Sequence, residues 1–283
     1  MTHHHRRLAK GASIVRSLVP RTAIAILWFH AFPAFAQEVA VGSFPEVKAF
    51  PGFLADGLAH QLSLSRVTDN REWLGAIGGS LPVIGARIGE WNIQGGVGAT
   101  TFNRLIKTPG HITVYTIDYK VDFPLDVRYH KTVYRIAFGH LSSHYADDGI
   151  EILGLHSIGY VRDYMTFAVA EDLELLHSTA YVSADWNFHY EPIAKPWILQ
   201  AGLQGGWFPL WDESATLYGA VDLKLRENLA WGTTQSYQIG VRCFPNGRFA
   251  LRLSYTLRLG FEERGQLYDE RVSLNLVGVT VEF

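Results

Sequence analysis

The residues with the clearest chemical potential lie in segment 138–151, which reads FGHLSSHYADDGIE. His140, Ser142 and His144 are spaced two apart, so in an extended strand all three side chains point to one face. A histidine beside a serine hydroxyl is what nucleophilic acyl transfer needs, because the imidazole takes the hydroxyl proton. The spacing indicates a candidate esterase with Ser142 as nucleophile and His140 as general base.

Such a base also requires a third group that orients its ring. We take Glu151 as the candidate for this role, with Asp148 and Asp163 as alternatives, because spacing alone does not choose among these acids. The ordinary alternative is that the histidines and serine are wet residues at the end of a strand, hydrogen-bonded to a loop and to lipid headgroups.

A metal site is another interpretation of the same segment. Carboxylate oxygens are calcium ligands, and a hydrolase can use a calcium ion to stabilise an oxyanion. The candidate ligands are His144, Asp147 and Asp148. The sequence Asp-Asp-Gly is also an ordinary turn.

Composition limits the classes of protein that could carry these residues. The net charge is -2 and 18% of residues are charged, which gives no indication of nucleic-acid binding. The 27 glycines, 13 tyrosines, 16 phenylalanines and 8 tryptophans suit strands, turns and membrane interfaces. Cys243 is the single cysteine, so an intramolecular disulfide and a cysteine metal cluster are excluded.

The N-terminus has the features of a secretory signal, which we assign to residues 1–36. Arginines and a lysine precede an apolar stretch over residues 22–32, and Ala34-Phe35-Ala36 supplies a small-x-small cleavage pattern. Residues 37–58, which contain Pro45 and Pro51, are predicted to be a periplasmic lead-in or short plug.

From residue 60 onward, apolar and polar residues alternate with a period of two. In segment 248–259, for example, Leu253, Tyr255 and Leu257 share one face, while Arg252 and Arg258 lie on the other. This alternation predicts strands. We expect twelve, at residues 60–68, 71–79, 87–101, 112–123, 131–142, 155–169, 178–190, 196–208, 215–226, 234–244, 248–260 and 271–283.

A soluble sandwich also alternates, but these segments have the length of tilted membrane-crossing strands, and aromatics gather near their ends. The chain also ends on Val277, Val279, Val281 and Phe283, which resembles the C-terminal signal read by the outer-membrane assembly machinery. We therefore predict an all-β fold: an antiparallel transmembrane β-barrel of about twelve strands, over residues 59–283, in the bacterial outer membrane.

The barrel predicts where each side chain points. An even strand number puts both termini in the periplasm, so Pro245-Asn246-Gly247 should be a periplasmic turn and 260–270 an outer loop. His140 and Ser142 should face lipid. The lumenal face should carry a mixed polar set, which either lines a channel or fills the interior with ion pairs: Arg135, Asp118, Lys120, Asp185, Asn187, Gln200, Gln204, Asp222, Lys224, Arg242, Arg252 and Arg258.

Within this architecture, His140-Leu141-Ser142 is similar to the His-x-Ser motif of outer-membrane phospholipase A and of the lipid A deacylases. Those families are β-barrels with the active site on the lipid-facing wall. The resemblance implies His140 as base and Ser142 as nucleophile. The orienting residue of those families would fall near Gly154 here, and Ser143 follows the serine in place of their Asn or Gly, so both positions depart from the pattern.

A longer pattern resembles bacterial exported proteins known only as a domain of unknown function. It consists of His-Leu-Ser-Ser-His-x-x-Asp-Asp, then Arg162-Asp163-Tyr164, a strand near Asp185, and Pro196-Trp197. This resemblance spans most of the mature chain and implies no activity. Two functional hypotheses follow: a lipid acyl hydrolase acting on membrane phospholipid or lipopolysaccharide, and a non-enzymatic narrow channel or structural barrel.

Overall fold

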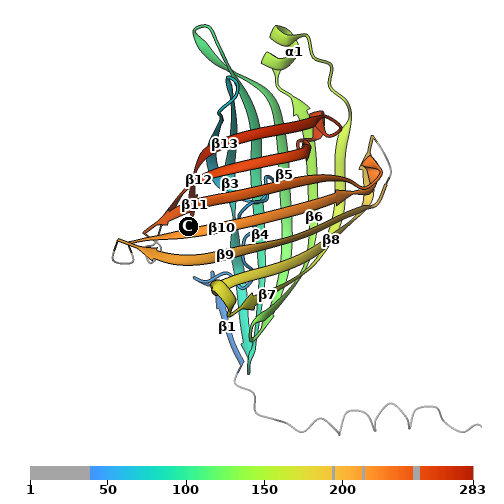
Figure 1. Ribbon diagram of the computed structural model, residues 1–283. Coiled ribbons are helices and arrows are strands. Elements are labelled where there is room, and N and C mark those ends of the chain that lie inside the picture. The colour runs from blue at the N-terminus through green and yellow to red at the C-terminus, as the bar shows by residue number, and fades with distance from the viewer. Residues whose placement is uncertain (1–38, 193–194, 212–213, 245–248, 283) are drawn as a thin grey trace, which may run out of the picture. The chain divides into compact units, whose positions relative to one another are not determined.

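The computed structural model describes residues 39–192, 195–211, 214–244 and 249–282. The predicted signal segment, residues 1–36, and the predicted turn Pro245-Asn246-Gly247 lie outside the described residues. The described chain forms a closed antiparallel β-barrel (Figure 1). No helix in these ranges is long and apolar enough to cross a membrane.

Twelve strands form the barrel wall, as the alternation predicts. Each pairs with the next along the chain, and β2 closes the ring by pairing with both β13 and β3. The strands are β2 (Leu62–Val67), β3 (Glu72–Ile88), β4 (Trp91–Thr108), β5 (His111–Tyr129), β6 (Thr132–Tyr145), β7 (Tyr160–Leu173), β8 (Ser178–Glu191), β9 (Trp197–Leu210), β10 (Ala215–Arg226), β11 (Gly232–Cys243), β12 (Ala250–Phe261) and β13 (Arg271–Glu282).

The predicted bounds differ from the structure at two strands that matter for the site. β3 continues to Ile88 rather than ending at 79. Its pairing with β4 shifts register just after Pro82, and such a shift accommodates a residue that has no N–H to donate. β7 begins at Tyr160 rather than 155. The residues before it include the short helix α1 (Asp147–Leu153), which is followed by Gly154 in the left-handed conformation that ends many helices.

The two faces of the wall separate apolar from polar side chains. On β12, Leu253 and Tyr255 are exposed on the outside, while Arg252 and Arg258 are buried inside. Most of the inner charges are paired; Arg135, for example, donates two hydrogen bonds of 2.7 and 2.8 Å to Asp126. The polar lumenal face is therefore a network of buried ion pairs and amides.

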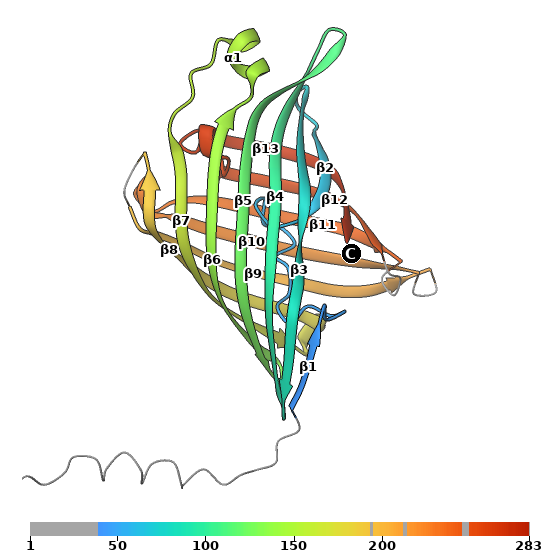
Figure 2. The same ribbon diagram turned by 180° about the vertical axis from the view of Figure 1, so that it is seen from behind.

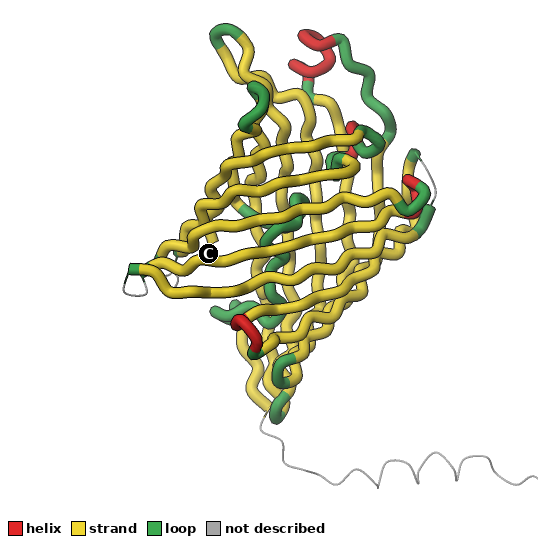
Figure 3. The backbone as a smooth tube through the Cα atoms, in the orientation of Figure 1, coloured by secondary structure: helices red, strands yellow, loops and turns green. Residues whose placement is uncertain are grey.

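Residues 44–61, here called the plug, run through the interior of the barrel (Figure 3). The strand β1 (Val39–Ser43) pairs with the end of β3, and the chain then turns inward. Phe50 is 2% exposed and packs in a cluster with Phe53 and Tyr181. The plug also reaches opposite walls, since the Ala49 and Leu54 amides donate to glutamines of β4 and β9. The lead-in segment thus fills the lumen.

Residues 262–270, here called the lid, connect β12 to β13 within the segment 260–270 that was predicted as an outer loop, whose first two residues instead end β12. Most of the lid is buried. Glu262, Glu263 and Arg264 are 0%, 5% and 3% exposed. The loop folds into the barrel mouth because its charges find partners there: Glu262 contacts Arg104 of β4 at 3.3 Å, and Glu263 contacts Lys224 of β10. The charged composition of the segment does not by itself show burial, which depends on the counter-charges that the wall provides.

Candidate functional site

The candidate chemistry is carried by the outer face of β6. His140 and Ser142 are partly exposed there and His144 is exposed, while the alternating residues Leu141 and Ser143 are buried inside. The strand period thus places the histidine and serine on one outer face, as predicted. Ser143, the neighbour of the candidate nucleophile, instead hydrogen-bonds to Asp118 and to the lid.

An acid lies directly across from His140 on the next strand. Asp163 of β7 is its register partner, and Asp163 Oδ1 lies 2.6 Å from His140 Nδ1. The second oxygen, Oδ2, lies 2.9 Å from His189 Nδ1 on β8, and His189 Nε2 is 3.5 Å from Glu191. Strands β6, β7 and β8 lie side by side (Figure 2). We call His140, Ser142, Asp163, His189 and Glu191 the outer-wall cluster.

The contact with Asp163 decides which nitrogen of His140 is available. A carboxylate accepts hydrogen bonds, so in the neutral imidazole this contact assigns the proton to Nδ1 and leaves Nε2 as the acceptor. The orienting contact is short and charge-assisted, which holds the ring in one position. Ser142 stands two residues further along the same face. Asp163, His140 and Ser142 thus share one outer face as an acid, a base and a hydroxyl, the residue types that nucleophilic catalysis needs.

An aromatic patch borders the cluster on the same outer face. Phe138 lies two residues before His140 on the same face of β6, and Phe188 lies directly before His189 on β8. The centroids of the two rings are 6.0 Å apart. Trp186 packs on Phe188 with a centroid distance of 5.9 Å. All three rings are more than 40% exposed. The cluster therefore sits at the boundary of an apolar surface that a lipid chain could contact.

The structure places the other predicted site residues elsewhere. Glu151 is exposed on α1, and the acid that contacts His140 is Asp163. Asp147 and Asp148 are exposed in the first turn of the same helix. Across the described ranges, no group of three or more His, Cys, Asp or Glu side chains is arranged to hold a metal ion.

Sequence reasoning left Asp163 as one alternative among three and did not single out His189. The signal that identifies both is strand register rather than spacing along the chain. Once residues 146–159 are recognised as a connection containing a helix, pairing β6 with β7 brings Asp163 opposite His140. Continuing to β8 brings His189 opposite Asp163.

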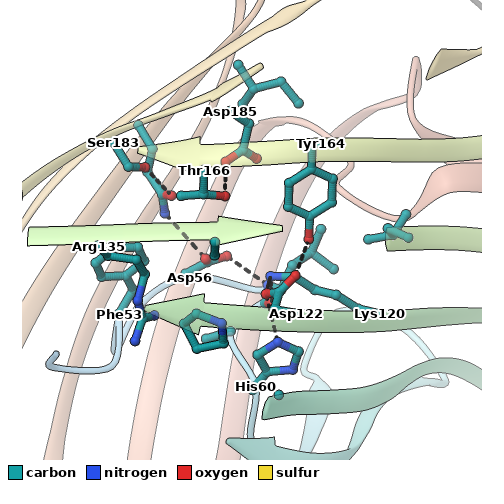
Figure 4. A pocket seen from close by; sticks show the side chains of 18 of the residues that line it. Phe53, Asp56, His60, Lys120, Asp122, Arg135, Tyr164, Thr166, Ser183 and Asp185 are labelled. Carbon is teal, nitrogen blue, oxygen red and sulfur yellow. Dashed lines mark hydrogen bonds and ion pairs between the residues drawn. The ribbon is translucent and has the colours of Figure 1, made fainter. Parts of the chain in front are cut away.

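A second candidate site is a cavity of about 140 Å³ inside the barrel, between the plug, the lid and the wall (Figure 4). His60, at the end of the plug, contacts Asp122 at 2.8 Å and Thr100 at 2.9 Å. Tyr164 donates to the other oxygen of Asp122 at 2.7 Å. Although an acid, an imidazole and a hydroxyl are aligned here, they are enclosed, and their contacts fasten the plug to the wall.

The buried plug groups have perturbed acidities. Burial alone would raise the pKa of Asp56, but the neighbouring Lys224 ammonium lowers this pKa to about 2. Burial lowers the pKa of His60 below its usual value, and the hydrogen bond to Asp122 acts in the opposite direction. The plug is thus held in place with Asp56 ionised and His60 neutral.

Comparisons with protein-family models and with curated proteins find no match. The chain matches no protein-family model, and no curated protein shows significant similarity to its sequence. The function therefore has to be inferred from the barrel, its outer-wall cluster and its closed lumen.

Proposed function

We propose that this chain is an outer-membrane β-barrel whose outer wall hydrolyses acyl esters of membrane lipids, phospholipid or lipopolysaccharide. Ser142 is the nucleophile, His140 the general base and Asp163 the group that orients the base. Asp163 takes the role for which Glu151 was the sequence candidate. The membrane location is supported by the closed barrel, its apolar outer face and the export and C-terminal patterns of the sequence.

The observation that carries the proposal is the 2.6 Å contact between Asp163 Oδ1 and His140 Nδ1 on the outer wall. Polar and ionisable side chains on a lipid-facing wall are unfavourable without partners, so a cluster of them there is a functional hypothesis by default. A barrel-stabilising ion pair would be equally well placed inside the lumen. This one instead presents His140 and Ser142 at the border of the aromatic patch.

The reaction proceeds in two balanced steps. His140 Nε2 takes the proton of Ser142 as its Oγ bonds to the ester carbonyl carbon, and the alcohol of the lipid leaves with that proton as the ester C–O bond breaks. Water then attacks the acyl-serine as His140 takes its proton; the bond between the acyl carbon and Ser142 Oγ breaks, His140 returns the proton to Oγ, and the fatty acid leaves. Asp163 stays ionised throughout and stabilises the imidazolium that forms transiently.

The decisive experiment measures fatty-acid release by the purified, refolded chain from mixed phospholipid and lipopolysaccharide micelles. The wild type is expected to release fatty acid. Ser142→Ala, His140→Ala and Asp163→Asn are each expected to lower the rate, by about 10²–10⁴-fold for the two that disable the base. Calcium and chelator arms test whether His144, Asp147 and Asp148 contribute an ion.

Neighbouring residues provide matched controls. Ser143→Ala removes a hydroxyl from the adjacent residue on the opposite face, and His144→Ala removes an imidazole from the same face. Glu151→Gln tests the sequence candidate against Asp163. Ser143→Ala and Glu151→Gln should retain activity if the outer-wall cluster is the site, and His144→Ala should retain the activity that is measured with chelator. Absence of fatty-acid release by folded wild type on both lipids would refute the hydrolase and favour the non-enzymatic barrel.

That alternative takes a specific form here. The described lumen is occupied by the plug, the lid and paired side chains, an arrangement that does not favour a permanently open channel. A structural barrel is therefore the alternative that inactivity would support.

A further inference from the structure

The buried arginines of the inner wall have carboxylate partners, with one exception. Arg104, Arg162 and Arg252 each have a carboxylate partner, at 2.8, 2.9 and 2.7 Å respectively. Arg258 has a weaker one in Glu263 at 3.7 Å. Arg226, at the end of β10, is 4% exposed, yet the described residues offer its guanidinium no ion pair.

The contacts of Arg226 include no carboxylate, although its guanidinium carbon lies 6.0 Å from the centre of the Phe261 ring. One terminal nitrogen, Nη2, donates to the backbone carbonyl of Glu262 at 2.8 Å and lies 3.5 Å from the Thr234 hydroxyl. The Nε–H is buried and has no hydrogen-bond partner. A buried charge without a counter-charge costs several kcal/mol in order of magnitude, and such groups normally mark an ion or water at the site.

The unsatisfied atoms around Arg226 are mostly of one type. Arg258 Nη1 and Arg264 Nε are also buried without a hydrogen-bond partner, whereas two unpaired acceptors lie on the lid and just after β10, Glu263 Oε2 and Asn228 Oδ1. The two arginines belong to β12 and to the lid, which contacts Arg226 through the Glu262 carbonyl. Unfilled donors that exceed unfilled acceptors favour an occupant that accepts hydrogen bonds and carries negative charge.

There is room for such an occupant. Arg226 lines the interior cavity of about 140 Å³, together with charged side chains of both signs. Each carboxylate of the lining contacts a cation other than Arg226; these carboxylates are Asp56, Asp122, Asp185 and Glu263. Roughly 15 Å³ of such space holds one water, so the cavity has room for a small oxyanion with water around it. The plug and the lid line this space from two sides, and Arg226 itself is 4% exposed, which favours a small free anion over one carried on a lipid headgroup.

We propose that the closed lumen binds a small free oxyanion of the phosphate, sulfate or carboxylate class, held by Arg226 beneath the lid. The anion supplies the missing counter-charge and accepts the free Nε–H. The anion contacts Arg226, which also contacts the lid through the Glu262 carbonyl. Binding of the anion therefore also stabilises the closed lid. This site is separate from the outer-wall cluster and does not depend on the proposed hydrolase.

The test compares unfolding of the full chain, refolded in a sugar-based detergent, in sodium phosphate and in sodium chloride at equal ionic strength. In wild type, the unfolding temperature is expected to rise steadily with phosphate and to stay flat with chloride, because a ligand stabilises the state that binds it. Arg226→Met should abolish the phosphate response. Arg104→Met is the matched control: it removes a buried arginine with carboxylate partners, so it should lower stability in both salts and keep the phosphate response.

A second measurement does not depend on the folding of the variants. Equilibrium dialysis of the refolded wild type against radiolabelled phosphate should show about one bound equivalent per chain that excess sulfate displaces. No phosphate-specific stabilisation together with no bound phosphate would overturn the proposal and assign water to Arg226. An equal phosphate response in folded Arg226→Met would place the bound anion elsewhere and overturn it as well.

Discussion

Lys224 joins the two segments that close the lumen, and replacing it tests how the closure is maintained. Its ammonium contacts Asp56 of the plug and Glu263 of the lid, and all three side chains are at most 10% exposed. The close packing extends to the backbone, since a Cβ on Gly57 would lie 2.3 Å from the Glu263 carboxylate. We expect Lys224→Met to loosen both segments together.

The expected loss of stability follows from the carboxylates that stay buried in the variant. Removing one partner of a buried ion pair costs about 3–5 kcal/mol, because the other charge stays buried without compensation. Here two carboxylates lose Lys224. Asp56 keeps the Leu58 amide at 2.8 Å and the Gln200 amide at 3.3 Å, and Glu263 keeps Arg258 at 3.7 Å. These remaining contacts make the lower part of that range the better estimate for each carboxylate.

Denaturant unfolding in detergent and limited proteolysis of the plug and lid provide the readout. Lys224→Met should lower the free energy of unfolding and make both segments cleavable. Neutralising the partners as well, in Lys224→Met with Asp56→Asn and Glu263→Gln, should recover most of the loss. If the single variant is as stable as wild type, or if the triple variant is no better than the single, the reasoning from uncompensated buried charge is refuted.

Two further predictions concern the plug and the lid. Ser143→Ala should destabilise the lid by about 1–3 kcal/mol, because it leaves the Gln266 amide and the Asp118 carboxylate without their shared hydroxyl. Proteolysis of residues 262–270 measures the loss of lid protection, and unchanged protection would contradict the assigned contact. Because the pKa of His60 is lowered in the folded state, its contribution is present above the unfolded pKa of about 6.5 and is lost as pH falls below that value. Plug protection should therefore weaken on acidification, and His60→Gln should flatten this dependence; an unchanged slope in the variant would assign it to another group.

The sequence by itself determined the strands and the direction of their side chains. Side-chain direction in a strand depends only on position along the chain, so a period of two is enough to place His140 and Ser142 on one face and Ser143 on the other. The same period identified the twelve strands of the barrel and the polar inner wall. These features are local, so the alternation of residues along the chain is enough to predict them.

The tertiary structure alone decided which residues meet across the barrel. The pairing of Asp163 with His140 depends on the register of β7 against β6, which the helix-containing connection between them sets and which spacing does not reveal. The burial of the lid could not be predicted from the sequence for another reason. A charged segment such as 262–270 suits either solvent or a buried network, and only the opposing charges of distant strands, such as Arg104 and Lys224, made burial favourable.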